Sequence, residues 1–325
     1  MLFLNKKDML KAIALESVMD KVEDAYRIFA GGKFNMPERP VVQDGENTVL
    51  FMPCFMENYF STKVLTLFPK NPGAGLPLIQ GLMLLNDAEN GETLAILDGS
   101  FLTSLRTGAV GGVAMRCFSP ENAASVGIIG AGTQGFYQAL YACAARPIKE
   151  IYLFDTGKKD WSAYVDSLRT ELGKNPPEIH IKSEVEELIT SSDIVVTATT
   201  SSVPVMPDDP GLLKGKCFVA IGSYKPDVRE MPDAIWKLVD HVYTELPFAV
   251  EESGDLSQPL ADGLLDIKQV RYIGDLLTKT PRPTAPPTEK TTFFKSVGMG
   301  LLDLNVAQLI YERALKMGLG QTVDL

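Results

Sequence analysis

The segment GAGTQG, from Gly130 to Gly135, has the spacing G-x-G-x-x-G that brings a backbone close to a phosphate. It follows an apolar run, ASVGIIG, and precedes the apolar segment FYQALYACAAR, which is typical of a helix. Gly130 would permit a tight turn, Gly132 would let the backbone approach a pyrophosphate, and Gly135 would allow close packing of helix and strand. The free N–H groups at the helix start would bind the phosphates. This context favours a dinucleotide site over a glycine-rich turn without a ligand.

An acidic residue follows about 20 positions later, as this kind of site requires. Asp155 ends the apolar run EIYLFD, where its carboxylate can accept hydrogen bonds from both ribose hydroxyls. The same charge repels a 2′-phosphate, so NAD(H) is favoured over NADP(H). Lys158 and Lys159 lie just beyond and soften this preference, which leaves NADP(H) open. A nicotinamide cofactor implies hydride chemistry.

Two later apolar runs, DIVVTATTS and LLKGKCFVAIGS, end in small and polar residues. Ligands bind at the carboxyl ends of the strands in a parallel sheet, so both ends should face the nicotinamide. The loop after the second run, IGSYKPDVREM, offers Tyr224 and Lys225 as candidate catalytic groups. Asp227 and Glu230 in the same loop are expected to cap the following helix.

Three basic residues in the first third of the chain could bind an acidic substrate. Lys63 interrupts the apolar run STKVLTLFP, although spacing alone favours a lysine at a sheet edge or one that reaches solvent. Arg106 precedes TGAVGGVA, which predicts a tightly packed helix, and at its start it could bind a carboxylate in a bidentate manner. On spacing alone, a structural ion pair is an equally good interpretation of Arg106. Arg39, between prolines in MPERP, suggests only a loop.

The elements that would position these residues change character along the chain. Residues 8 to 30 have helical periodicity, with a start at Asn5 or Lys7, and residues 37 to 100 contain short strand-like runs with a hairpin around Glu89-Asn90-Gly91. From about 119, strands and helices alternate, which predicts a doubly wound parallel sheet. A Pro-rich connector at 280 to 290 precedes a last amphipathic helix. The expected class is α/β, a Rossmann domain plus an α+β domain.

Composition restricts the function further. The formal net charge of -10 argues against nucleic acid and an anionic membrane surface as partners. The four cysteines show no metal-binding or disulfide spacing, and no apolar run reaches the roughly 18 residues that span a bilayer. We therefore expect a cytoplasmic protein without a metal site.

These segments together resemble the ornithine cyclodeaminase/mu-crystallin family, which comprises dimeric enzymes that use NAD(P). The resemblance extends from about residue 37 to 305 through TKV, LRTGA, the dinucleotide turn, SYKPDVREM and KSVG. It implies a substrate and dimerisation domain at 1–118, completed by 302–325, around a Rossmann domain at 119–301. It also implies a homodimer and a small carboxylate-bearing imine or amino acid as the substrate.

By this resemblance Lys63 and Arg106 belong to the substrate pocket, where Arg106 binds the α-carboxylate, Arg39 makes a second carboxylate contact, and Lys63 orients the substrate or relays a proton. Cofactor contacts are expected from the glycine turn, the strand ends and KSVG, namely Thr107, Gly130, Ala131, Gly132, Thr133, Gln134, Gly135, Asp155, Thr197, Ala198, Thr199, Gly222, Ser223, Ser296, Val297 and Gly298.

Members of the family differ in reaction, and the loop at Tyr224 bears on the choice. Cyclodeaminases and the family's alanine dehydrogenases carry an Asp there as the expected acid/base. This chain has Tyr224, and its loop is similar to that of the ketimine reductases, with Lys225 in place of their Arg. The resemblance therefore implies reduction of a cyclic 2-imino acid such as pyrroline- or piperideine-2-carboxylate. Cyclodeamination of ornithine, dehydrogenation of an open-chain or N-substituted amino acid, and ligand binding without catalysis remain alternatives.

Overall fold

The computed structural model describes residues 1–158, 160–280, 286–287 and 289–324, and the chain divides into two units. Unit 1 comprises Met1–Arg106 and Gly298–Leu325, and unit 2 comprises Thr107–Val297. The sequence places these boundaries later, after residues 118 and 301. The first division falls inside helix α3 (Gly99–Phe118), which continues through residue 106 without a break. Most of the Pro-rich connector at 280–290 lies outside the described residues.

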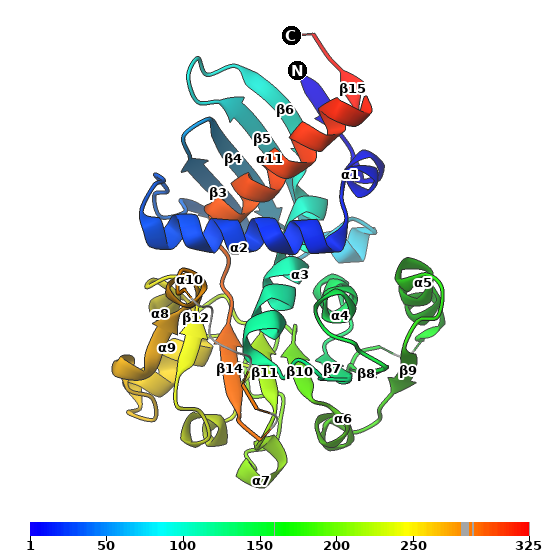
Figure 1. Cartoon of the computed structure of the whole chain (residues 1–325), viewed down its shortest axis with the longest axis vertical. Coiled ribbons are helices and arrows are strands. Elements are labelled where there is room, and N and C mark those ends of the chain that lie inside the picture. The colour runs from blue at the N-terminus through cyan, green and yellow to red at the C-terminus, as the bar shows by residue number, and fades with distance from the viewer. Residues whose placement is uncertain (159, 281–285, 288, 325) are drawn as a thin grey trace. The chain divides into compact units, whose positions relative to one another are not determined.

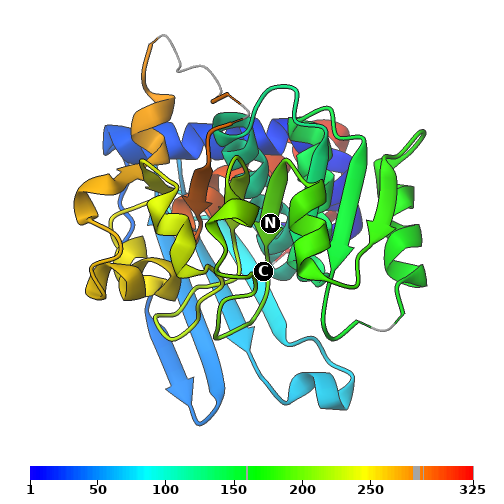
Figure 2. The ribbon, with the colours of Figure 1, turned by 90° about the horizontal axis from the view of Figure 1, so that it is seen from below.

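Unit 1 is built on a seven-stranded sheet in the order β15-β1-β6-β5-β4-β3-β2. Neighbours from β2 to β6 pair antiparallel, which confirms the predicted strands and hairpin. Figure 2 shows β3, β4 and β5 side by side as blue to cyan arrows. The strands are β1 (Leu2–Leu4), β2 (Val41–Asp44), β3 (Asn47–Phe55), β4 (Tyr59–Leu67), β5 (Ile79–Asp87), β6 (Thr93–Asp98) and β15 (Gln321–Thr322).

One face of this sheet is covered by the last helix, α11 (Gly300–Met317). It lies across β3, β4 and β5 and contacts α2 (Leu15–Gly31), as Figure 1 shows. Side chains alternate between the faces of a strand, so the buried residues Ser61, Lys63 and Leu65 of β4 share the covered face. A lysine therefore lies beneath the helix, which decides against the sheet-edge alternative.

The single helix predicted for residues 8 to 30 is wrong, because the chain forms α1 (Lys6–Ala12) and then α2. Ile13 and Ala14 adopt extended backbone angles. The Ser17 hydroxyl accepts a hydrogen bond from the Ala14 N–H at 3.3 Å and donates to its carbonyl at 2.7 Å, which begins a new helix. The predicted start at Asn5 is confirmed, since Asn5 caps α1.

Unit 2 contains an eight-stranded sheet in the order β13-β12-β14-β11-β10-β7-β8-β9, and all its paired neighbours run parallel. The chain order reverses between β7 and β10, which is the place where doubly wound sheets bind ligands. The predicted Rossmann fold is confirmed. Its strands are β7 (Ser125–Ile129), β8 (Glu150–Phe154), β9 (Glu178–Ile181), β10 (Ile194–Thr197), β11 (Cys217–Ala220), β12 (Val242–Thr244), β13 (Val270–Tyr272) and β14 (Thr292–Lys295).

Helices connect these parallel strands, as crossovers require. On one side of the core, Phe293 packs edge-on against Trp236 with ring centroids 5.3 Å apart. No helix in the described part of the chain is both long and apolar enough to cross a bilayer. The remaining helical segments are η1 (Asn71–Ala74) in unit 1 and, in unit 2, α4 (Thr133–Ala145), α5 (Ser162–Leu172), α6 (Val185–Ser191), α7 (Pro210–Leu213), η2 (Asp233–Lys237), α8 (Ala249–Glu252), α9 (Gly254–Ala261), η3 (Ile267–Gln269) and α10 (Ile273–Leu277).

The small residues of α3 allow it to lie very close to α4, as TGAVGGVA predicts. A Cβ at Gly111 would lie 1.8 Å from the side-chain oxygen of Gln138, and one at Gly108 would lie 2.5 Å from the ring of Tyr141. Gln138 is fully buried, and its amide donates to the carbonyl of Thr107 at 2.9 Å. Thr107 thereby ties α3 to the helix that follows the glycine turn.

Candidate active site

The glycine turn has the geometry that its sequence predicts. Gly130 adopts a φ of 101°, and a Cβ there would lie 2.6 Å from the carbonyl of Ala198. A Cβ at Gly135 would lie 2.0 Å from the Gly130 carbonyl, so helix and turn are in close contact. Gly132 faces open space and no side chain among the described residues caps α4, which leaves its first N–H groups available to an anion. Thr133 and Gln134 form the first turn of this helix.

A pocket of about 820 Å³ opens beside this turn. It brings Gly130 and Gly132 together with Asp155, which follows β8, and with Ala198 and Thr199, which follow β10. Its apolar wall comprises Ile129, Phe154, Val185, Pro204, Val205, Met206 and Pro207. Glycine backbone, one carboxylate and an apolar wall match the pyrophosphate, ribose and adenine of a dinucleotide in chemical type.

Asp155 holds the turn as well as facing the pocket. One of its oxygens accepts from the Ala131 N–H at 2.8 Å, and the other accepts from the N–H groups of Gly157 at 2.8 Å and Lys158 at 3.1 Å. The Lys158 ammonium lies 4.8 Å from the ring centre of Tyr164 and 5.7 Å from that of Trp161. This cation–π contact engages the ammonium. Lys159 lies outside the described residues.

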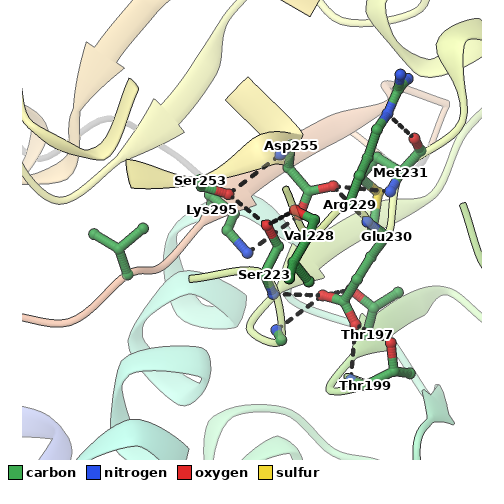
Figure 3. A network of polar contacts seen from close by, with 12 residues as sticks. Thr197, Thr199, Ser223, Val228, Arg229, Glu230, Met231, Ser253, Asp255 and Lys295 are labelled. Carbon is green, nitrogen blue, oxygen red and sulfur yellow. Dashed lines mark hydrogen bonds and ion pairs between the residues drawn. The ribbon is translucent and has the colours of Figure 1, made fainter. Parts of the chain in front are cut away.

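The end of β10 and the loop after β11 are joined by Glu230, which Figure 3 shows among its partners. Its carboxylate accepts hydrogen bonds from Thr197 Oγ1 at 2.9 Å, from the Thr199 N–H at 2.7 Å and hydroxyl at 2.8 Å, and from the N–H groups of Gly222 at 2.8 Å and Ser223 at 3.3 Å. The prediction that Glu230 caps the following helix is therefore wrong. Five donors from two strand ends hold a fully buried carboxylate in place.

Two further charged groups lie beside Glu230 in the interior. Asp255 accepts from the N–H groups of Glu230 at 2.7 Å and Met231 at 2.9 Å, and its other oxygen lies 3.2 Å from the ammonium of Lys295. All three side chains are fully buried. Burial raises the pKa of the Glu230 carboxyl, the Lys295 ammonium opposes this rise, and the Asp255 carboxylate reinforces it.

The candidate catalytic residues Tyr224 and Lys225 lie in the loop after β11. Tyr224 is 38% exposed, and the Lys225 ammonium lies 5.7 Å from the centre of its ring. Asp227 is also exposed and does not cap the next helical segment of the described chain, because η2 has Pro232 at its N-cap position. The capping role predicted for Asp227 is therefore wrong as well, and the roles of Tyr224 and Lys225 stay predictions.

In unit 1 the structure brings Lys63 and Arg106 together around a buried carboxylate that sequence reasoning missed. The Lys63 ammonium lies 2.7 Å from Oδ1 of Asp303, and Arg106 Nε donates to the same oxygen at 3.1 Å. Lys63 and Asp303 are fully buried, and Arg106 is nearly so. Arg106 lies inside α3 rather than at its start, because the helix already begins at Gly99.

The surroundings of Lys63 perturb its acidity. Burial lowers its pKa to about 8, an effect that the Asp303 carboxylate opposes and the nearby cations Arg106 and Arg39 increase. Arg39, half-buried, is therefore close enough to influence the cluster. Cys54 is also buried there, and burial together with the charge of Asp303 raises the pKa of its thiol to about 12. Lys63 therefore loses its proton more readily than an ordinary lysine.

The motif KSVG begins at Lys295, the last residue of β14, and continues beyond the strand. Ser296 and Val297 are buried, and the Val297 N–H donates to the Glu245 carboxylate at 2.8 Å. Gly298 has a φ of 77°, and a Cβ there would lie 2.6 Å from a terminal nitrogen of Arg106. The guanidinium therefore lies directly over glycine backbone, and a larger residue at 298 would displace it.

Sequence reasoning missed the acidic partners of the basic residues. Asp303 lies in LLDLNVAQLIYERA, a helix in which a single acid near the start suggests only a favourable helix dipole. Lys295 in TTFFKSVG interrupts an apolar strand in the same way as Lys63 does in STKVLTLFP. A charged residue inside an apolar run is the one signal that could have indicated a buried ion pair in both cases.

Comparison with known protein families gives a match over residues 1–318 to the ornithine cyclodeaminase/mu-crystallin family. A Δ1-pyrroline-2-carboxylate reductase of Bacillus cereus is 31% identical over 331 residues and covers 100% of both chains. An alanine dehydrogenase of Archaeoglobus fulgidus is 29% identical over 323 residues, with 99% of this chain and 98% of the relative covered.

Solved structures give the same pattern. A Δ1-pyrroline-2-carboxylate reductase of Thermococcus litoralis, in complex with NADH and L-proline, superposes with a TM-score of 0.90 at 30% identity and covers 99% of this chain and 100% of that one. An archaeal alanine dehydrogenase dimer with bound NAD superposes with a TM-score of 0.88 at 27% identity, with 99% and 98% covered.

Proposed function

The chain belongs to the ornithine cyclodeaminase/mu-crystallin family, and from this premise we propose that it reduces a small cyclic 2-imino acid to the amino acid. As a member it is an NAD(P)-dependent oxidoreductase that acts on C=N and CH–NH bonds. The substrates proposed are pyrroline-2-carboxylate, piperideine-2-carboxylate and related ketimines. The cluster of Lys63, Asp303 and Arg106 carries this proposal.

The cluster supplies what imine reduction requires from the protein. The Arg106 guanidinium provides a fork of N–H donors for the substrate carboxylate, and Asp303 orients it through Nε. Lys63 has a pKa lowered to about 8, so at neutral pH it carries a proton that it can transfer to the imine nitrogen. A bound nicotinamide supplies the hydride to the imine carbon. One hydride and one proton together convert C=N into CH–NH.

NAD(H) is the proposed cofactor. Asp155 faces the pocket beside the glycine turn, where its charge disfavours a 2′-phosphate. The Lys158 ammonium contacts two aromatic rings, which makes it less available to bind a 2′-phosphate. The structures of two relatives contain NADH or NAD, in agreement with this preference.

The absence of an Asp at position 224 supports reduction over cyclodeamination. Ring closure with loss of ammonia needs acid/base chemistry on an amine in addition to hydride transfer. Tyr224 replaces the acid that the cyclodeaminases carry, whereas a reductase needs only the proton that Lys63 can provide. We assign Tyr224 and Lys225 an assisting role in orienting the substrate.

Steady-state oxidation of NADH and NADPH tests this function with pyrroline-2-carboxylate and piperideine-2-carboxylate. Turnover with either imine, faster with NADH, is expected. Proline and ammonia formed from ornithine without net NADH would instead indicate a cyclodeaminase. The archaeal alanine dehydrogenase at 29% identity favours alanine as the open-chain alternative, for which the sign is stoichiometric NADH from the amino acid.

A homodimer is proposed through the open face of the unit 1 sheet. Phe51, Val64 and Leu82 are cross-strand neighbours, and this row lies opposite the face that bears Lys63. Leu82 is 52% exposed and Phe51 36%, and Val42, which pairs with Val49 on the same face, is exposed as well. A contiguous apolar surface of this kind is typical of a protein interface. One relative is a dimer, which agrees with this assignment.

A further inference from the structure

Glu230 makes hydrogen bonds to several segments around the cofactor pocket. Besides the five donors to its carboxylate, its backbone carbonyl accepts from the Val205 N–H at 2.9 Å. Thr199 and Val205 both line the pocket, whereas Gly222 and Ser223 follow the end of β11. One residue therefore holds two pocket walls and a neighbouring strand end in register.

The close approach of these strand ends depends on the same contacts. A Cβ at Gly222 would lie 2.2 Å from the Thr199 carbonyl and 2.5 Å from the Glu230 carboxylate. Backbone N–H groups of Thr199, Gly222 and Ser223 point at one buried anion. Without an acceptor these buried donors would be unsatisfied, so the strand ends would separate or admit water.

Charge balance within the network does not explain why this position carries an acid. In their ionised forms Glu230 and Asp255 carry two negative charges and Lys295 carries one positive charge, so the fully buried group would contain one negative charge more than it balances. Replacing Glu230 by a neutral residue of the same size would leave the pair of Asp255 and Lys295 matched. A purely electrostatic view therefore predicts that such a change is tolerated or stabilising.

We propose that Glu230 is a positioning residue for the cofactor, because it fixes the carboxyl ends of β10 and β11 against which the dinucleotide binds. This inference takes only the identity of the cofactor, NAD(H), from the proposed function. Glu230 is fully buried and is not itself among the residues that line the pocket. It acts through Thr199 and Val205 at the pocket and through Gly222 and Ser223 at the end of β11.

The test is the dissociation constant for NADH, measured by fluorescence titration of the full chain with the variant Glu230→Gln. A glutamine presents an amide nitrogen where the carboxylate accepts hydrogen bonds, so NADH is expected to bind at least about tenfold more weakly. The KM for NADH should rise in parallel, while the KM for the imine should stay close to that of the unmodified chain.

Asp193 provides a matched control in the same sheet, at the amino ends of the strands rather than at their carboxyl ends. Its carboxylate accepts from the Ala124 N–H at 2.8 Å and from the Ser125 N–H at 3.0 Å and hydroxyl at 2.9 Å, which ties the amino ends of β7 and β10. Asp193→Asn is expected to lower the thermal unfolding midpoint and to leave the affinity for NADH unchanged.

Two results would overturn the proposal. One is a folded Glu230→Gln protein that binds NADH as tightly as the unmodified chain. The other is an equal loss of NADH affinity in Asp193→Asn, which would indicate a general loosening of the sheet.

If Glu230→Gln does not fold, the variant Thr197→Val takes its place. It removes one hydrogen-bond donor to Glu230, and the Thr197 side chain is buried and does not line the pocket. A roughly threefold loss of affinity supports the proposal and no loss refutes it. Failure of the unmodified chain to bind NADH would instead contradict the proposed function.

Discussion

Replacing Asp303 by asparagine should shift the pH dependence of imine reduction to lower pH. In the intact cluster the Asp303 carboxylate favours the protonated form of Lys63, whose pKa is about 8. If Lys63 donates the proton, kcat/KM should be constant below that value and should fall as pH rises through it. Asp303→Asn keeps the shape of the side chain and an oxygen acceptor, but it removes the charge that opposes loss of the proton.

The size of the shift follows from the contact distance. Opposite charges 2.7 Å apart attract by about 6 kcal/mol at an effective dielectric constant of about 20. One pKa unit corresponds to about 1.4 kcal/mol, so even a quarter of this attraction would lower the pKa of Lys63 by about one unit. The remaining cations, Arg106 and Arg39, act in the same direction. The alkaline limb should therefore move from near pH 8 to about pH 7 or below.

The assay is kcat/KM for a cyclic imine acid between pH 5.5 and about 9.5, at saturating NADH, for the unmodified chain and the variant. Titration of the imine itself is identical in both and cancels in the comparison. Glu312→Gln is the control, because it makes the same chemical change on α11 where the carboxylate accepts from Gln308 at 2.8 Å. Its profile should match that of the unmodified chain. An alkaline limb that stays near pH 8 in folded Asp303→Asn would refute Lys63 as the proton donor.

Three further changes test other parts of the site. Asp155→Ser should raise the ratio of NADPH to NADH efficiency at least about tenfold, measured as kcat/KM for each cofactor, and an unchanged ratio would contradict its role in discrimination. Arg106→Lys keeps the charge but loses the fork of donors, so the KM for the imine should rise about tenfold with the KM for NADH unaffected; equal changes in both would argue against carboxylate binding. Leu82→Glu places a charge in the row formed with Phe51, and light scattering should show a monomer, whereas a dimer would exclude this face as the interface.

The sequence predicted the elements that have a strong period or a fixed spacing. The parallel sheet, the hairpin around Asn90 and the turn at Gly130 all follow from local rules. The break at Ala14 was missed because helical periodicity continues across it, although the backbone does not. Strand β1 is only three residues long and offers too few positions for a period.

In the candidate site, too, the residues marked by local sequence were predicted and their distant partners were not. Lys63 and Arg106 were identified by their positions in apolar segments and by family resemblance, but their shared partner Asp303 lies about 200 residues farther along the chain than Arg106. Glu230 was assigned to a cap because an acid shortly before a helix usually serves there. Five donors at the ends of two different strands bind it instead, and no local pattern encodes contacts of that kind.

The shared carboxylate oxygen of Asp303 has a consequence for ligand choice. One carboxylate balances two cationic side chains, Lys63 and Arg106, so the cluster retains a surplus positive charge where little water can reach it. An enclosed surplus of charge is unfavourable until an ion of opposite sign arrives. A carboxylate ligand reduces this surplus, whereas an uncharged amide of the same shape leaves it unchanged. Among ligands of equal size, affinity should therefore follow the number of charges before it follows shape.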